Sequence, residues 1–193
     1  MSGPIGIDHV TLCVDNLAAA EFLFTKILGF DVTWSARDVG TENSSMDTIV
    51  VQRGLIRVAI MQGRDKAIKS QISEFVEHFG SGVQHIALEV DDLEAVCREW
   101  EGHGVKFTGP AKEGRDGFGP LRQRFTYPLF PGSGVFLELI QRELGGEKSK
   151  TFAKGTVESL YQDIERDQMN GVHQTIIDFD KEMPNHEALK KAS

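Results

Sequence analysis

The sequence has few cysteines, no long apolar run and no excess of positive charge, and each shortage excludes a class of protein. Its two cysteines, Cys13 and Cys97, form neither a disulfide framework nor a zinc-binding spacing. No apolar run approaches the ~20 residues of a membrane span, and the first residues lack the basic and apolar regions of a signal peptide. A net charge of -8 and a pI of about 5.3 make nucleic acid a poor partner. We therefore expect a cytoplasmic protein that binds neither membranes nor nucleic acids.

The sequence does contain an internal repeat. GIDHVTLCVDNL (residues 6–17) and GVQHIALEVDDL (residues 82–93) align when His9 is placed on His85. Both segments carry a Gly three residues before the His, alternating apolar positions after it, and a Val-Asp pair that leads into a Leu. The alternation predicts a β-strand in each copy, and repetition at a long spacing predicts two modules of similar fold.

A helix and three strands are expected to follow each of these strands. The apolar residues of 16–28 and 92–103 recur at helical spacing, and a Gly follows each segment. The further strands are expected at 30–36, 47–53, 56–62, 105–110, 122–128 and 134–142. We therefore predict an α+β fold of two tandem βαβββ modules, about 5–63 and 82–142, joined by a helix at 66–80. These modules make up a metal-binding domain, 1–145, and residues 146–193 are expected to hold a C-terminal helix and a polar tail.

Two histidines and one glutamate are the candidate metal ligands. Alternation along the strands places His9 on the face opposite Val10, and places Glu138 on the corresponding face of the last strand. A pseudo-twofold relation between the modules would bring His9 and His85 together. A single His on a strand is more simply a buried polar residue, but the symmetric pair and a costly buried carboxylate favour a metal. Two His and one carboxylate suit non-haem Fe(II), although Zn²⁺ and Mn²⁺ stay open on this evidence.

Several motifs resemble those of a known family. KSQI, GVQHIAL, RQRFTYP and FLELIQR, with IDHV near the start, are similar to the vicinal oxygen chelate superfamily. They more closely resemble the catalytic, C-terminal half of 4-hydroxyphenylpyruvate dioxygenase and of the related 4-hydroxymandelate synthases, over about residues 5–168. The resemblance implies a half-barrel pair and Fe(II) as the cofactor. It implies the following site residues: His9, His85 and Glu138 as metal ligands, and Gln71, Gln84, Gln123 and Phe125 as substrate-binding residues. Positioning of the metal ligands is the alternative role for the three glutamines.

The sequence departs from that family at the substrate pocket. Thr48 stands where the family has a Ser, and Met61 stands where it has an Asn that serves the phenol end of the substrate. A site that hydrogen-bonds a hydroxyl discriminates strongly, whereas an apolar site discriminates weakly. Met61 therefore indicates an altered substrate. The usual non-catalytic half does not precede this segment, so we expect a homo-oligomer in which self-association covers exposed surface.

The resemblance implies an Fe(II)-dependent dioxygenase that acts on an aryl pyruvate-like 2-oxo acid and O₂. The expected reaction is oxidative decarboxylation coupled to hydroxylation of the same molecule. The tail helix, with Phe152, Val157 and Tyr161, is expected to form a lid, the alternative being a helix packed outside a sheet or against a second subunit. Extradiol ring cleavage, a glyoxalase-like isomerisation and a non-catalytic binding module are the competing functions.

Overall fold

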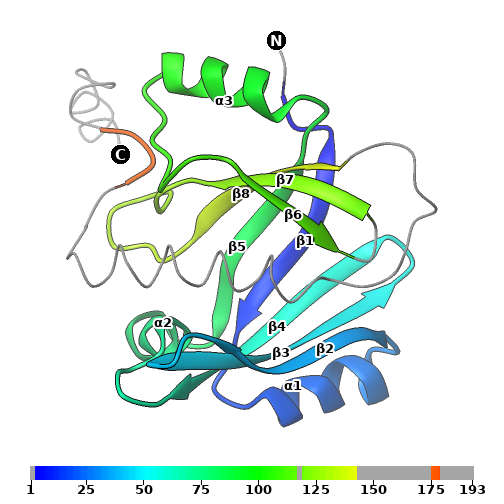
Figure 1. Cartoon of the computed structure of the whole chain (residues 1–193). Helices are drawn as coiled ribbons and strands as arrows, with labels where there is room; N and C mark the ends of the chain where they lie inside the picture. The colour runs from blue at the N-terminus through cyan, green and yellow to red at the C-terminus, as the bar shows by residue number, and fades with distance from the viewer. Residues whose placement is uncertain (1–2, 117–118, 143–174, 179–193) are drawn as a thin grey trace, which may run out of the picture.

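The described strands form one mixed sheet of eight strands, and the helices pack around it (Figure 1). The structure is a computed structural model, and it describes residues 3–116, 119–142 and 175–178. The strands lie in the order β2-β3-β4-β1-β5-β8-β7-β6. Their bounds are β1 Gly6–Cys13, β2 Asp31–Gly40, β3 Ser44–Arg53, β4 Ile56–Asp65, β5 Gly82–Glu89, β6 Lys112–Asp116, β7 Gly119–Phe125 and β8 Phe136–Arg142. The α-helices are α1 Leu17–Phe22, α2 Gln71–Phe79 and α3 Leu93–Gly102, and a π-helical turn, η1 Leu23–Ile27, continues α1.

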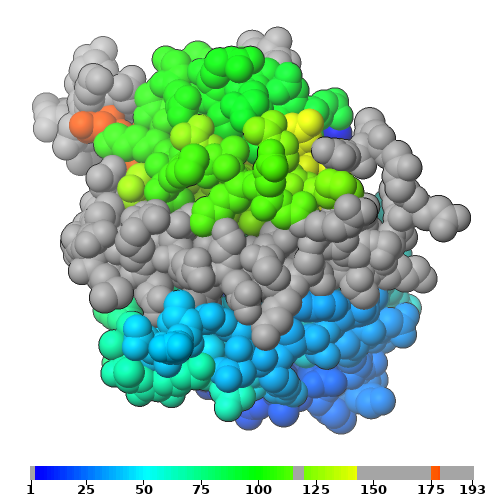
Figure 2. Space-filling model, in the orientation of Figure 1, coloured from blue at the N-terminus to red at the C-terminus, as the bar shows by residue number. Residues whose placement is uncertain are grey.

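The two repeats use the same strand pairing. In each repeat the first strand pairs in parallel with the last, β1 with β4 and β5 with β8. The other neighbours within a repeat pair antiparallel. The repeats join where β1 and β5 run antiparallel to each other. Figure 1 shows the two groups of strands curling apart from this seam, with α1 outside one group and α3 outside the other. Figure 2 shows the first repeat, in blue and cyan, at the lower end of the molecule and the second, in green and yellow, at the upper end.

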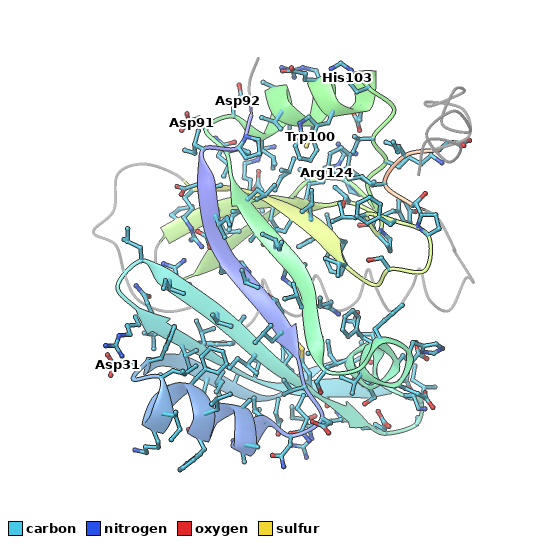
Figure 3. The ribbon with its side chains drawn as sticks, turned by 180° about the vertical axis from the view of Figure 1, so that it is seen from behind. Asp31, Asp91, Asp92, Trp100, His103 and Arg124 are labelled. Atoms are coloured by element: carbon cyan, nitrogen blue, oxygen red, sulfur yellow. The ribbon has the colours of Figure 1, made fainter. Side chains whose placement is uncertain are left out.

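Each outer helix buries its apolar face against its own strands. Leu17 of α1 packs with Ile49, Val51 and Ile60 of β3 and β4. The equivalent Leu93 of α3 packs with Leu139 of β8. Figure 3 shows Trp100 pointing from α3 toward the sheet, while Asp91 and Asp92 lie at the start of the helix and His103 at its end. The helices therefore cover the convex side of each group of strands, and the concave side of the sheet is left to form a site.

The repeat extends to the hydrogen bonds that begin each helix. Asn16 and Asp92 cap α1 and α3 by accepting from the amides of Ala19 and Ala95. The last strand of each repeat adds a glutamine to the same helix start. Gln62 Oε1 accepts from the Leu17 amide at 2.8 Å, and Gln141 Oε1 accepts from the Leu93 amide at 2.8 Å. Helix starts leave such amides without intrahelical partners, so the glutamines fix each helix to its sheet.

Three expectations about these elements need correction. The predicted strand at 105–110 contributes only the Phe107–Thr126 bridge, and the strand lies instead at β6, where a Lys- and Arg-containing segment shows no apolar alternation. The predicted helix at 16–28 changes to π-helical hydrogen bonding after Phe22. The linking helix starts at Gln71 rather than at 66, because β4 continues to Asp65 and Ser70 supplies the N-cap. No helix among the described residues is long and apolar enough to cross a membrane.

Candidate metal centre

The three predicted ligands lie together on the concave face of the sheet. His9 comes from β1, His85 from β5 and Glu138 from β8. One Glu138 oxygen, Oε2, lies 3.5 Å from His9 Nε2 and 3.6 Å from His85 Nε2. The ligand atoms of the three residues all lie within 4.8 Å of one another, and all three side chains are buried. Two atoms that bind one metal ion at about 2.1 Å lie about 3.0–3.4 Å apart, so this arrangement can hold an ion after small adjustments.

Two β-bulges at the seam between β1 and β5 support the histidines. Ile7 pairs with Leu88 and His9 with Ala87, so Asp8 is an extra residue on β1. Thr11 pairs with His85 and Leu12 with Val83, so Gln84 is an extra residue on β5. A bulge disrupts alternation and re-aims side chains. Here each bulge lets the side chain of the residue before the His contact the ring of that His.

These contacts define which ring nitrogen faces the glutamate. Asp8 Oδ1 lies 2.8 Å from His9 Nδ1, and Gln84 Oε1 lies 3.1 Å from His85 Nδ1. A carboxylate or amide oxygen can accept a hydrogen bond but cannot donate one. In a neutral imidazole with this contact, the proton therefore lies on Nδ1. Each Nε2 then keeps its lone pair toward Glu138, which is the form a metal ligand requires.

Asp8 is itself held by two arginines. Arg142 donates from Nε to Asp8 Oδ2 at 2.6 Å and from a second nitrogen to Oδ1 at 3.1 Å, and Arg57 donates to Oδ1 at 3.1 Å. Burial alone would raise the pKa of Asp8, but the hydrogen bonds from His9 and Arg142 and the charge of Arg142 outweigh burial and hold that pKa well below its usual range. Asp8 therefore stays ionised and presents a charge to His9.

His85 has a drier and more aromatic environment than His9. Complete burial, assisted by the neighbouring His9, lowers the pKa of His85 well below its usual value. The His85 ring stacks on Phe136, with ring centroids 4.9 Å apart. Phe125 lies edge-on to Phe136 at 6.3 Å, so a short aromatic wall adjoins the site.

The other residues predicted for the substrate pocket are buried, and they come from β3, β4, β7 and the start of α2. Thr48 and Met61 pair with each other on β3 and β4. Gln71 is the first residue of α2, and Gln123 lies two residues before Phe125 on β7. The hydrogen bond between Gln84 and His85 favours a positioning role for that glutamine.

The predicted lid residues, Phe152, Val157 and Tyr161, lie outside the described residues, so the lid stays a prediction.

The sequence reasoning missed Asp8, Arg142 and Phe136. A signal for Asp8 was available, because the aligned repeats place Asp8 and Gln84 at the same position before each His. Arg142 pairs with Asp8 across 134 residues of chain, and no local pattern predicts such a contact.

Paired βαβββ repeats with a buried His, His and Glu on their inner strands define a protein of the vicinal oxygen chelate class. The chain belongs to the glyoxalase/bleomycin resistance protein/dioxygenase superfamily, whose family model matches residues 8–127.

Curated relatives and a solved structure narrow this similarity. The chain is 28% identical to 4-hydroxyphenylpyruvate dioxygenase from Yarrowia lipolytica, covering 85% of this chain and 51% of the relative. It is 30% identical to the enzyme of that name from Xenopus tropicalis, and the match covers 88% of this chain and 54% of the relative. The chain thus spans about half the length of these relatives. A mutant of 4-hydroxymandelate synthase from Streptomyces coelicolor matches with a TM-score of 0.75 and 25% identity, over 84% of this chain and 54% of that one. Methylmalonyl-CoA epimerase from Mycobacterium tuberculosis shares the fold. It matches with a TM-score of 0.55 and 24% identity, over 74% of this chain and 91% of that one.

Proposed function

We propose that the protein is an Fe(II)-dependent dioxygenase that acts on an aryl pyruvate-like 2-oxo acid. The reaction would be oxidative decarboxylation coupled to hydroxylation of the same molecule. The observation that carries the proposal is the buried group of His9, His85 and Glu138, whose ligand atoms converge within 4.8 Å. The names of the curated relatives support the same reaction class.

The donor set fits Fe(II) by its chemistry. Two neutral imidazoles and one carboxylate form the facial triad that non-haem Fe(II) oxygenases use, which leaves positions open for substrate and O₂. Neither thiol competes with these residues for the metal. Cys13 of β1 packs in one apolar cluster, and Cys97 of α3 packs in another. Zn²⁺ or Mn²⁺ would fit similar donors, and for this reason the test below uses a redox reaction.

Bound Fe(II) would supply the redox chemistry by which O₂ reacts with the 2-oxo acid. His9, His85 and Glu138 would hold the ion, and Asp8 and Gln84 would fix the two rings through their Nδ1 protons. Phe125 and Phe136 would pack against the aryl group. Buried surroundings keep water away from the reacting groups, which strengthens every electrostatic contact in the site.

We further propose that residues 1–145 form the metal-binding domain and that the protein is cytoplasmic, where free thiols such as Cys13 and Cys97 persist. The partners would be the small 2-oxo acid and O₂. Self-association as a homo-oligomer would cover exposed apolar residues such as Leu55, which is 96% exposed.

Extradiol ring cleavage and glyoxalase-like isomerisation use similar metal ligands, so the reaction products must separate them. The test is anaerobic reconstitution with Fe(II), followed by addition of O₂ and a panel of aryl and alkyl 2-oxo acids. The proposal expects one CO₂ released for each O₂ consumed. O₂ consumption without CO₂ would indicate ring cleavage, and turnover without O₂ would indicate an isomerase.

A further inference from the structure

Thr11 carries a buried hydroxyl without a hydrogen-bond partner. Its side chain is fully buried, and among the described residues no donor or acceptor bonds to Thr11 Oγ1. Most buried hydroxyl groups in proteins are paired, so an orphan of this kind calls for an explanation. Thr11 lies two residues after His9 on β1, and alternation therefore places it on the same concave face as that ligand.

The pairing of strands places Thr11 inside the site rather than beside it. One row across the sheet runs from His9 to Ala87 and then to Glu138. The neighbouring row runs from His85 to Thr11 and then to Ala59. The repeat relates these two rows, because His9 corresponds to His85, Ala87 to Thr11 and Glu138 to Ala59.

The two related rows have different chemistry. The first row contributes the carboxylate of Glu138, while the second has only the methyl group of Ala59 at the corresponding position. The first row has the methyl of Ala87 where the second has the Thr11 hydroxyl. The half of the site without a protein carboxylate therefore combines a small side chain with an unpaired hydroxyl, and ligand pockets use such isolated polar groups to orient a ligand.

We propose that Thr11 is a substrate-binding residue whose hydroxyl donates a hydrogen bond to an oxygen of the 2-oxo acid. The inference rests on the proposed function, because it assigns the 2-oxo acid as the ligand. The carboxylate and keto groups of such a substrate offer only acceptor oxygens, and a Thr hydroxyl can donate to them. A charged acceptor makes the stronger bond, so the carboxylate is the favoured partner.

A second buried threonine shows what a structural hydroxyl looks like in this fold. Thr126 is also buried, but its Oγ1 donates to the Tyr127 carbonyl at 2.8 Å and accepts from the Leu137 amide at 3.0 Å. Removing that hydroxyl leaves two backbone groups without their partner. Removing the Thr11 hydroxyl leaves no described group unpaired, and it abolishes the cost of burying an orphan.

The first test measures stability without substrate or metal. Thr11→Val keeps the β-branched shape and replaces the hydroxyl by a methyl group. We expect Thr11→Val to raise the midpoint of denaturant unfolding of the full chain, whereas the matched control Thr126→Val lowers it. A fall in Thr11→Val comparable with that in Thr126→Val would show a structural hydroxyl and overturn the proposal.

The second test measures binding of phenylpyruvate to the Fe(II)-loaded protein by anaerobic calorimetry. Thr11→Val should bind Fe(II) as the wild type does but bind phenylpyruvate about tenfold more weakly, equivalent to about 1.4 kcal/mol. Thr11→Ser, which keeps the hydroxyl, should stay close to the wild type. Equal phenylpyruvate affinity in wild type and Thr11→Val overturns the role of Thr11 alone. A wild type that binds no Fe(II) or no phenylpyruvate overturns the proposed function together with this inference.

Discussion

Single positions explain why, among the described residues, the two similar repeats form one group of candidate metal ligands and not a symmetric pair of such groups. The repeats agree at His9 and His85 but differ at the third ligand, where Glu138 corresponds to Ala59. They also differ before each histidine, where a charged Asp8 corresponds to a neutral Gln84. Because a charged carboxylate bonds one ring and a neutral amide bonds the other, the two histidines are supported unequally. Divergence at a few positions has thus turned a symmetric frame into an asymmetric site.

Met61 gives a prediction about substrate choice. Its apolar side chain packs with Cys13 and Ala59 and offers no hydrogen bond to a phenol. We expect the wild type to turn over phenylpyruvate at least as well as 4-hydroxyphenylpyruvate. Met61→Asn should shift the kcat/KM ratio toward the phenol, by roughly tenfold for one added hydrogen bond. The measurement is competitive turnover of the two acids. A wild type that already prefers the phenol strongly, and loses that preference in Gln84→Leu, would contradict the role of Met61.

The secondary-structure elements were predictable where apolar spacing was regular. Alternation predicted β1, β5 and β8, and alignment of the repeats correctly identified Ala59 as the counterpart of Glu138. The segment of β6, Lys112–Asp116, could not be recognised, since a short polar strand at the sheet edge has no apolar alternation. The bulges at Asp8 and Gln84 were equally hidden, because a bulge is visible only once the register between two strands is known. The convergence of the three candidate ligands on one face of the sheet was therefore predictable, but the orientation of each side chain was not.

The glutamine at the end of each repeat gives a prediction at the scale of the helix. Gln141 on β8 accepts from the buried start of α3, at the Leu93 amide. Gln141→Leu should lower the free energy of unfolding by about 1 kcal/mol, because the amide loses its acceptor. Gln141→Glu keeps an acceptor oxygen and is the matched control, expected near the wild type. Chemical denaturation measures both variants, and equal stability of Gln141→Leu and the wild type would remove the glutamine from the account of α3.

At the scale of the molecule, the described strands form one continuous sheet, and the two repeats meet at the candidate metal site. Asp8 belongs to the first repeat and Arg142 to the second, so their paired hydrogen bonds cross the seam. The seam also contains the β1–β5 ladder and both histidines. A site built from both repeats requires them to hold a fixed relation, and the Asp8 cluster provides a charged link in addition to the backbone ladder.

Breaking this link should destabilise the whole protein. The Arg142 side chain is 14% exposed, and Asp8 is 4% exposed at its side chain. Arg142→Met should lower the free energy of unfolding by about 2–3 kcal/mol, less than for a fully buried pair because Arg57 still contacts Asp8. The control is Arg122→Met on β7, whose more exposed ion pair with Glu94 should contribute less than about 1 kcal/mol. Thermal or urea unfolding should show one transition for each protein, and an Arg142→Met as stable as Arg122→Met would argue against the link.

The stoichiometry of Fe(II) binding tests the central claim most directly. Anaerobic Fe(II) titration of the wild type should give about one ion per chain, and His85→Ala should lose that binding while keeping the wild-type circular dichroism. His78→Ala is the matched control, because His78 is an exposed residue near the end of α2 and its loss should leave binding unchanged. Full iron occupancy in a folded His85→Ala protein would contradict a metal centre formed by His9, His85 and Glu138.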